Sequence, residues 1–255
     1  MIRPPNVAYI DGDIVAYQTA FWAETGDPSK IPSQVKHILK NWMPKECDHK
    51  VICLSCSRSD NFRRELWPDY KAHRDTAYAP EYLDDVKQYL MSEYMVETRP
   101  RLEADDVMGI AASGLEGVAV TIDKDLLGVP GWHYNPNKDN NIRFVKKKDA
   151  KRFFFTQWMT GDSTDNIPGL WKIGPKKAER FLNETPEEEW EAGILELYES
   201  DRHQVRNRGD LSCYDTALIM ARCVNILSTK NYDKETEEII FWEPKVGLDS
   251  NKEMP

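Results

Sequence analysis

The sequence has little cysteine and histidine, and this limits the metal and disulfide chemistry it can support. Its 255 residues include 5 Cys and 5 His. An odd number of cysteines does not suggest a disulfide framework. Cys53 and Cys56 have CxxC spacing, but they lie in an apolar segment typical of a buried strand, and a structural zinc site needs about four ligands. Zinc binding is the weaker interpretation of these cysteines, and small buried side chains are the stronger one.

Signals for membrane insertion and secretion are also missing. No apolar stretch approaches the roughly 20 residues that span a bilayer. The N-terminal segment MIRPPNVAYIDGD has no hydrophobic region of the signal-peptide kind. We therefore expect a cytosolic protein. Its length and its hydrophobic fraction of 40% are those of a globular protein with one core, or with one core and a small appendage.

Positive charge is scarce overall but locally concentrated. The net charge of −9 at pH 7 argues against broad, non-specific binding to nucleic acid. For a specific partner, local patches of basic side chains matter more than the net charge. The basic side chains cluster in four segments, at residues 58–64, 146–152, 172–180 and 202–208.

Short apolar segments alternate with helical patterns in the first half of the chain. Residues 35–43 and 81–94 show helical spacing, and residues 24–34 are predicted to be loop. This alternation predicts an α/β fold with a mainly parallel sheet flanked by helices. The C-terminal third is predicted to be mostly helical. Strands are predicted at VAYID (7–11), KVICLS (50–55), MVET (95–98) and GVAVTID (117–123), with a further late strand at EIIFW (238–242).

Eight acidic residues fall where this fold predicts a strand end or a helix start. The carboxyl ends of parallel strands meet at one edge of a sheet, which is where ligands bind. A single acid at such a position is more often a capping or turn residue. The joint pattern differs, because eight carboxylates brought together would not all ionise without cations between them. The eight are Asp11, Glu103, Asp105, Asp106, Asp123, Asp125, Asp162 and Asp165.

Oxygen ligands of this kind select hard divalent ions, Mg²⁺ or Mn²⁺. Such ions support two-metal cleavage of phosphodiesters, because one ion lowers the pKa of an attacking water and the ions together stabilise the leaving oxygen. The crowding of three acids in residues 103–106 then has a function, since binding of metal relieves their repulsion.

Five segments carry a recognisable pattern: YIDGD (9–13), FRRELWPDYKAHR (62–74), LEADDVMG (102–109), TIDKDLLG (121–128) and TGDSTDNIPGLWKIGPKKAERFL (160–182). Together they resemble the 5′-nuclease superfamily, which contains flap endonucleases, phage 5′→3′ exonucleases and the 5′-nuclease domain of bacterial DNA polymerase I. They follow the family's order, and their form looks most like a phage or bacterial stand-alone enzyme. The resemblance implies a PIN-like nuclease core at 1–158 with a short arch at about 62–95. It implies a helix-hairpin-helix DNA-binding region with C-terminal helices at 159–255.

The resemblance also implies residue roles in a Mg²⁺- or Mn²⁺-dependent 5′→3′ exonuclease and flap endonuclease. The eight acids would hold two or more ions, and Lys71 and Arg74 would act as catalytic residues beside the scissile phosphate. Tyr70 would stack on a base. A hairpin would hold the duplex, often with a monovalent cation such as K⁺. The DNA-binding residues implied are Tyr70, Gly169, Gly174, Lys176, Lys177 and Arg180.

The sequence departs from the family pattern at two places. The family often has a further acid near the position of Cys56, and Asp60 lies four residues later. Asp13 is an extra acid that would support the metal ligands from outside. Two other functions stay open, a ribonuclease on the related PIN-type scaffold and a non-catalytic DNA-junction binder. The expected partner is 5′-ended, nicked or branched duplex DNA or an RNA–DNA hybrid, bound by a monomer in the cytoplasm, which is the bacterial host's if a phage encodes it.

Overall fold

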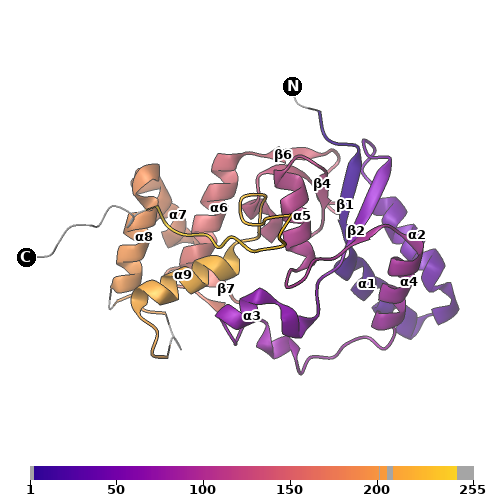
Figure 1. The fold of residues 1–255 in the computed structure, drawn as a ribbon, viewed down its shortest axis with the longest axis horizontal. Helices are drawn as coiled ribbons and strands as arrows, with labels where there is room; N and C mark the ends of the chain where they lie inside the picture. Colours follow the sequence, from indigo (N-terminus) through magenta and orange to yellow (C-terminus); the bar gives the residue numbers. More distant parts are fainter. Residues whose placement is uncertain (1–2, 201, 206–208, 246–255) are drawn as a thin grey trace, which may run out of the picture.

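The computed structural model describes residues 3–200, 202–205 and 209–245. Six strands form one sheet in the order β3-β2-β1-β4-β5-β6 (Figure 1). Its strand pairs are parallel except for the antiparallel β5–β6 pair. Two further strands, β7 and β8, pair antiparallel. The strands are β1 (Val7–Asp11), β2 (His49–Cys53), β3 (Val96–Glu97), β4 (Val118–Val120), β5 (Gly131–Tyr134), β6 (Arg143–Val145), β7 (Gly161–Asp162) and β8 (Ile167–Pro168).

Helices cover both faces of the six-stranded sheet and continue beyond it. Helices α1, α2 and α4 pack on one face, α5 packs on the other, and α6 to α9 form a second group (Figure 1). The structure also contains short 3-10 helices, among them η3 (Ala72–Arg74) and η4 (Asp125–Gly128). The α-helices are α1 (Gly12–Thr25), α2 (Ile31–Trp42), α3 (Phe62–Leu66), α4 (Leu83–Glu93), α5 (Ala104–Ser113), α6 (Lys147–Thr160), α7 (Pro175–Glu184), α8 (Trp190–Glu199) and α9 (Cys213–Val224).

The central strand β1 shows why the sheet needs helices on both faces. Alternate side chains of a strand point to opposite faces. Ala8 and Ile10 are buried in the core beneath α1, α2 and α4, whereas Tyr9 packs against the core beneath α5. The predicted mainly parallel sheet flanked by helices is therefore confirmed.

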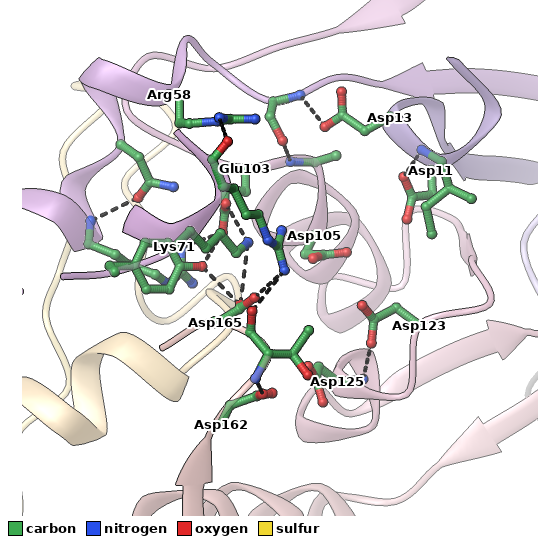
Figure 2. A pocket seen from close by; sticks show the side chains of 18 of the residues that line it. Asp11, Asp13, Arg58, Lys71, Glu103, Asp105, Asp123, Asp125, Asp162 and Asp165 are labelled. Carbon is green, nitrogen blue, oxygen red and sulfur yellow. Dashed lines mark hydrogen bonds and ion pairs between the residues drawn. The ribbon is translucent and has the colours of Figure 1, made fainter. Parts of the chain in front are cut away.

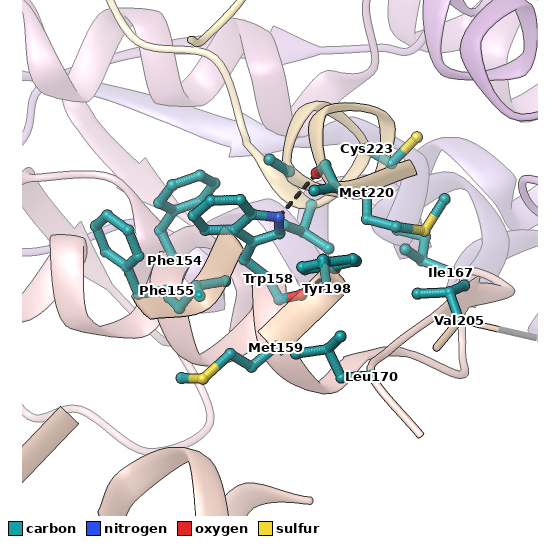
Figure 3. Packing of buried hydrophobic residues seen from close by; sticks show 14 of the residues in the cluster. Phe154, Phe155, Trp158, Met159, Ile167, Leu170, Tyr198, Val205, Met220 and Cys223 are labelled. Atoms are coloured by element: carbon teal, nitrogen blue, oxygen red, sulfur yellow. Dashed lines mark hydrogen bonds between the residues drawn. The ribbon is translucent and has the colours of Figure 1, made fainter. Parts of the chain in front are cut away.

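A second core joins the C-terminal helices to the segment around α3. The indole of Trp158 is fully buried, and its Nε1 donates to the carbonyl of Ala217 at 2.8 Å. The hydroxyl of Tyr198 donates to the carbonyl of Trp158 at 2.7 Å (Figure 3). Trp67 and Tyr70 belong to the same core. The division of the chain into residues 1–158 and 159–255 stays a prediction. Most of the buried apolar side chains of α6 pack in this second core.

Some predicted elements differ from those observed. Helix α1 continues to Thr25 and α2 begins at Ile31, so most of the predicted loop at 24–34 is helical. Pro32 favours the early start of α2, because its fixed φ suits the first turn of a helix. The predicted strand at 238–242 is wrong, since only an isolated Tyr232–Ile239 bridge forms there. Among the described residues, no helix is long and apolar enough to cross a membrane.

Candidate active site

A cavity of about 780 Å³ opens where the carboxyl ends of β1 and β4 meet the start of α5. Seven of the eight predicted acids line this cavity, and their carboxylates face it from four separate segments (Figure 2). The fold therefore brings together residues that are up to 154 positions apart in the chain. The seven are Asp11, Glu103, Asp105, Asp123, Asp125, Asp162 and Asp165.

Asp11 is fixed between the two central strands. It ends β1 and caps α1, where its Oδ1 accepts from the amide of Ile14 at 3.0 Å. Its Oδ2 accepts from the hydroxyl of Thr121, just after β4, at 2.9 Å. Burial raises the pKa of Asp11 to about 7, and the neighbouring charges of Asp13 and Asp123 add to the rise.

A second set of carboxylates comes from the turn after β4 and from β7. The amide of Asp125 donates to Asp123 Oδ1 at 2.8 Å, and Gln157 Nε2 donates to Asp125 Oδ1 at 3.0 Å. Asp162 Oδ1 accepts from the amide of Thr164 at 2.8 Å. Burial raises the pKa of Asp125 to about 7, and the charges of Asp123 and Asp162 contribute.

Asp105 lies between these two sets, in the first turn of α5 (Figure 2). Burial raises its pKa, and the charges of Asp11 and Asp123 raise it further. The five carboxylates thus repel one another across the cavity. Among the described residues, the only ion pair that these five carboxylates make joins Asp125 to Lys124 Nζ at 3.8 Å, and Lys124 is 72% exposed, so solvent weakens its effect. The charge of Lys71 also lowers the pKa of Asp105, but burial and the neighbouring acids outweigh it. We call the five the acid cluster: Asp11, Asp105, Asp123, Asp125 and Asp162.

The other two cavity acids are paired with cations (Figure 2). Lys71 Nζ lies 2.7 Å from Glu103 Oε1 and 3.3 Å from Asp165 Oδ2. Arg74 Nη2 lies 2.7 Å from Asp165 Oδ1. Burial alone would raise the pKa of Glu103, but the charges of Lys71 and Arg63 and the hydrogen bonds from Lys71 and Tyr70 together outweigh it and lower that pKa to about 2. Lys71 and Arg74 therefore line the cavity, each held by a carboxylate of the same chain.

Tyr70 does not have the surroundings that base stacking needs. Its side chain is 2% exposed and belongs to the C-terminal core, so neither face of the ring is open to a base. Its hydroxyl donates to Glu103 Oε2 at 2.7 Å and lies 3.2 Å from Asp165 Oδ2. The stacking role implied by the resemblance is thus corrected to one of positioning two carboxylates.

Asp106, the eighth predicted ligand, lies outside the cavity and is fully buried. Arg63 donates to both of its oxygens at 2.7 Å, which forms a bidentate pair. The amides of Glu103 and Leu227 also donate to it, at 3.1 and 3.0 Å. Four donors surround the carboxylate, so it is a structural residue and not the ligand we predicted.

Arg63 is a residue that the sequence reasoning missed. Its guanidinium is also buried and donates to the carbonyls of Cys223 and Asn225 at 2.9 Å. It therefore joins α3, α5 and the end of α9. An arginine directly after Phe62, one helical turn before Trp67, was the available signal, because an arginine that shares the buried side of a helix needs an anionic partner.

The two departures from the family pattern have different positions. Asp13 lines the cavity, but Lys87 Nζ is 3.0 Å from its Oδ1 and the amide of Ser55 donates to its Oδ2 at 3.1 Å. Asp60 is exposed and does not line the cavity. Cys56 does line it, and burial raises the pKa of its thiol to about 11, so the sulfur stays protonated and is a poor ligand.

Comparison with known proteins shows which family this chain belongs to. Residues 6–152 match the family described as 5′-3′ exonuclease, N-terminal resolvase-like domain. The chain belongs to the 5′-3′ exonuclease family. The exodeoxyribonuclease of Enterobacteria phage T3 is 33% identical over 229 residues, which cover 80% of this chain and 72% of the relative. A 5′-3′ exonuclease of Buchnera aphidicola is 33% identical over 207 residues, or 71% of each chain.

Further relatives and solved structures agree with this exonuclease family. The flap endonuclease Xni of Shewanella piezotolerans is 29% identical over 175 residues, covering 62% of this chain and 66% of the relative. The T5 D15 protein co-crystallised with metal ions has the same fold, with a TM-score of 0.59 and 17% identity over 85% of this chain and 89% of the other. The predicted family is confirmed, and so is the prediction of an enzyme that hydrolyses phosphodiesters.

The acid cluster of this exonuclease fits a hard divalent ion in its chemistry. All its donors are oxygens, and the charges of neighbouring acids add to the rise that burial causes in the pKa values of Asp11 and Asp125. Within residues 3–200, 202–205 and 209–245, no three His, Cys, Asp or Glu side chains converge closely enough to hold one ion alone.

Except for Tyr70, which lines the cavity, the predicted DNA-binding residues lie apart from it, on α7 and the turn before it. Gly169 is required there, because a Cβ atom would lie 2.1 Å from the backbone of Thr160. Gly174 caps α7 in an extended conformation with open space around it, so a tight turn does not require it. The side chains on the first two turns of α7 that we predicted are exposed: Lys176, Lys177 and Arg180.

Proposed function

We propose that this protein hydrolyses phosphodiester bonds at the 5′ ends, nicks and 5′ flaps of duplex DNA, with two or more divalent ions, Mg²⁺ or Mn²⁺, held by the acid cluster. One observation carries the proposal: five carboxylates face one cavity without a buried cation among them, while Lys71 and Arg74 stand at its side. Phosphate oxygens are the groups that such ions and such side chains bind in common.

Separate groups of side chains would hold the ions and contact the scissile phosphate. When bound, the ions supply an attacking water of lowered pKa and a counter-charge for the leaving oxygen. Asp11, Asp105, Asp123, Asp125 and Asp162 would hold them. Lys71 and Arg74 are kept extended by Glu103 and Asp165, so their donors need only exchange a carboxylate for the scissile phosphate.

Helix α7 would hold the duplex away from the cleavage point. Its N-terminus follows the turn at 169–174 and carries exposed lysines, and the free amides of a helix start favour a phosphate. We include in the proposal a monovalent cation such as K⁺ at this turn, RNA–DNA hybrids as further substrates, and action as a monomer. Because the similar exonucleases come from phages and bacteria, we also propose that the enzyme acts in the cytoplasm.

Neutralising one carboxylate from either half of the acid cluster tests the metal site. Asp123→Asn and Asp162→Asn should each lower cleavage at least about 100-fold, since each removes a charge that holds a divalent ion. The measurement is a product map on 5′-labelled flap and nicked duplexes with Mg²⁺. The exposed Asp84→Asn on α4 is the matched control and should cleave normally.

The same assay distinguishes the alternative functions. Cleavage that persists in EDTA, or full activity of both variants, would contradict the metal-dependent mechanism. Cleavage of single-stranded RNA without cleavage of 5′-ended DNA would favour a PIN-type ribonuclease. Binding of nicked DNA without any cleavage would favour a junction-binding protein.

Charge reversal on α7 tests the duplex contact separately. The double variant Lys176→Glu/Lys177→Glu should bind nicked duplex at least about tenfold more weakly and reduce the salt dependence of binding by one or two phosphate contacts. Its cleavage rate at saturating DNA should stay near that of the wild type, because α7 lies outside the cavity. Lys36→Glu/Lys40→Glu on α2 makes the same change of net charge on the other side of the molecule (Figure 1). An equal loss from both double variants would contradict the proposed role of α7.

A further inference from the structure

Two exposed aromatic rings lie at the mouth of the cavity. Phe21 on α1 is 48% exposed, and Tyr78, in the connection from η3 to α4, is 71% exposed. Both line the cavity. Their ring centroids are 6.3 Å apart, and a third ring, Tyr17, lies 6.4 Å from Phe21. We call Phe21 and Tyr78 the aromatic pair.

The fold does not need the aromatic pair for its own stability. Neither ring belongs to a hydrophobic core of the described residues. An exposed apolar surface beside a charged cavity is a typical binding feature, since water solvates it poorly. The pair therefore needs an explanation outside the packing of the chain.

One face of α1 connects the acid cluster to the aromatic pair. Ile14, Tyr17, Gln18 and Phe21 all line the cavity, and their spacing of three and four residues places them on one side of the helix. Asp11 caps the N-terminal end of this helix. Phe21 thus lies roughly 15 Å further along the axis, at 1.5 Å per residue. The cavity wall leads from the site of cleavage to the two rings.

The half-buried carboxylate of Glu24 holds the ring of Tyr78 in place. Glu24 Oε1 accepts from the hydroxyl of Tyr78 at 2.5 Å and from the amide of Glu81 at 2.8 Å. These bonds tie the connection between η3 and α4 to helix α1, so the ring is positioned before any ligand arrives. A ligand that stacks there loses less free energy to ordering the protein.

We propose that the aromatic pair is a stacking site for the unpaired bases of a single-stranded 5′ segment, next to the cavity that cleaves it. This inference rests on the proposed function. Glu24 repels a phosphate beside the ring of Tyr78, whereas bases offer neutral π faces to the rings. The occupant is single-stranded because bases within a duplex already stack on each other. The pair supplies the base contact that the buried Tyr70 cannot make.

Removing the bases from the substrate tests the stacking site directly. The two probes are duplexes with the same 5′ overhang, one with normal bases and one with abasic residues, and Ca²⁺ replaces Mg²⁺ during the binding measurement. Wild-type protein should bind the overhang with bases about tenfold more tightly, a typical effect of stacking. Phe21→Ala/Tyr78→Ala should lose that difference. Tyr78→Phe keeps the ring and should keep most of it.

Matched variants and a cleavage assay separate the possible failures. Tyr214→Ala removes an exposed ring from α9 and should leave the base preference intact. No base preference in a wild type that cleaves normally with Mg²⁺ overturns the stacking site alone. Equal weakening of both probes by Phe21→Ala/Tyr78→Ala also overturns it, because the rings would then only brace the connection. Absence of cleavage by the wild type overturns the proposed function and the stacking site together.

Discussion

Two groups of carboxylates share one cavity, yet their electrostatic surroundings are opposite. Glu103 is neutralised by Lys71, and its pKa falls to about 2. Asp11 and Asp125 are buried among other acids, and the pKa of each rises to about 7. We call the first group, Glu103 and Asp165, complete because Lys71 and Arg74 of the same chain neutralise it. The second group, the acid cluster, is incomplete because only cations from solution can neutralise it. Its carboxylates therefore repel one another in the folded chain.

The largest expected effect comes from removing Arg63, which pairs with the buried Asp106 and also lies 3.6 Å from Glu103 of the first group. Arg63→Met should lower the free energy of unfolding by about 3–5 kcal/mol, because it leaves the buried Asp106 without its counter-charge. Urea unfolding measures this change. The neighbouring Arg64→Met removes a partly exposed pair with Asp75 and should lower it by about 1 kcal/mol or less. Equal losses would show that the buried pair is no more important than the exposed one.

A smaller effect should appear in the incomplete group when metal is removed. Asp11 and Asp125 have folded-state pKa values of about 7, above the ordinary 3.8, so the folded protein holds protons that the unfolded chain has released. Stability in EDTA should therefore fall as pH rises from about 4 to about 7, by about 2–4 kcal/mol. Glu103 acts oppositely, since its lowered pKa stabilises the fold above about 4.5 and that contribution is lost toward about 2.

Urea unfolding at about pH 5 and about pH 8 measures the loss of stability. Saturating Mg²⁺ should remove the loss at the higher pH, and Asp125→Asn should reduce it in EDTA. The same stability at both pH values in EDTA would mean that ionisation of Asp11 and Asp125 does not destabilise the fold, which would contradict this prediction.

The smallest effect is expected at Asp60, which lies outside both groups. Asp60→Asn should change stability by no more than about 0.5 kcal/mol and cleavage by no more than about twofold, because the residue is exposed and does not line the cavity. The product map used for the acid cluster measures the cleavage. A large loss of cleavage would instead assign Asp60 the role of the acid that the family often has near Cys56.

Positions that depend on local pattern could be predicted from the sequence. The strand at 7–11 and the helix at 81–94 carry clear periodicity, and both form with small shifts of their ends. Asp11 and Asp123 could be placed because they follow strands whose carboxyl ends meet at one edge of the sheet. These inferences needed only the order of elements along the chain.

Positions that depend on distant partners could not be predicted. Asp105 and Asp106 are adjacent in sequence, but one faces the cavity and the other faces Arg63, which is 43 residues away. The turn of the helix separates them, and the sequence does not say which of the two points inward. Tyr70 was misjudged for the same reason, because the core that buries its ring comes largely from residues 154–224.

The contacts of Arg63 also bear on how the enzyme is made. The pair that anchors the start of α5 is completed by the carbonyls of Cys223 and Asn225 and by the amide of Leu227. A growing chain on the ribosome lacks these groups until residues 223–227 have been added. We therefore expect that a chain shorter than this cannot yet cut nucleic acid, and that competence appears only after these residues have left the ribosome.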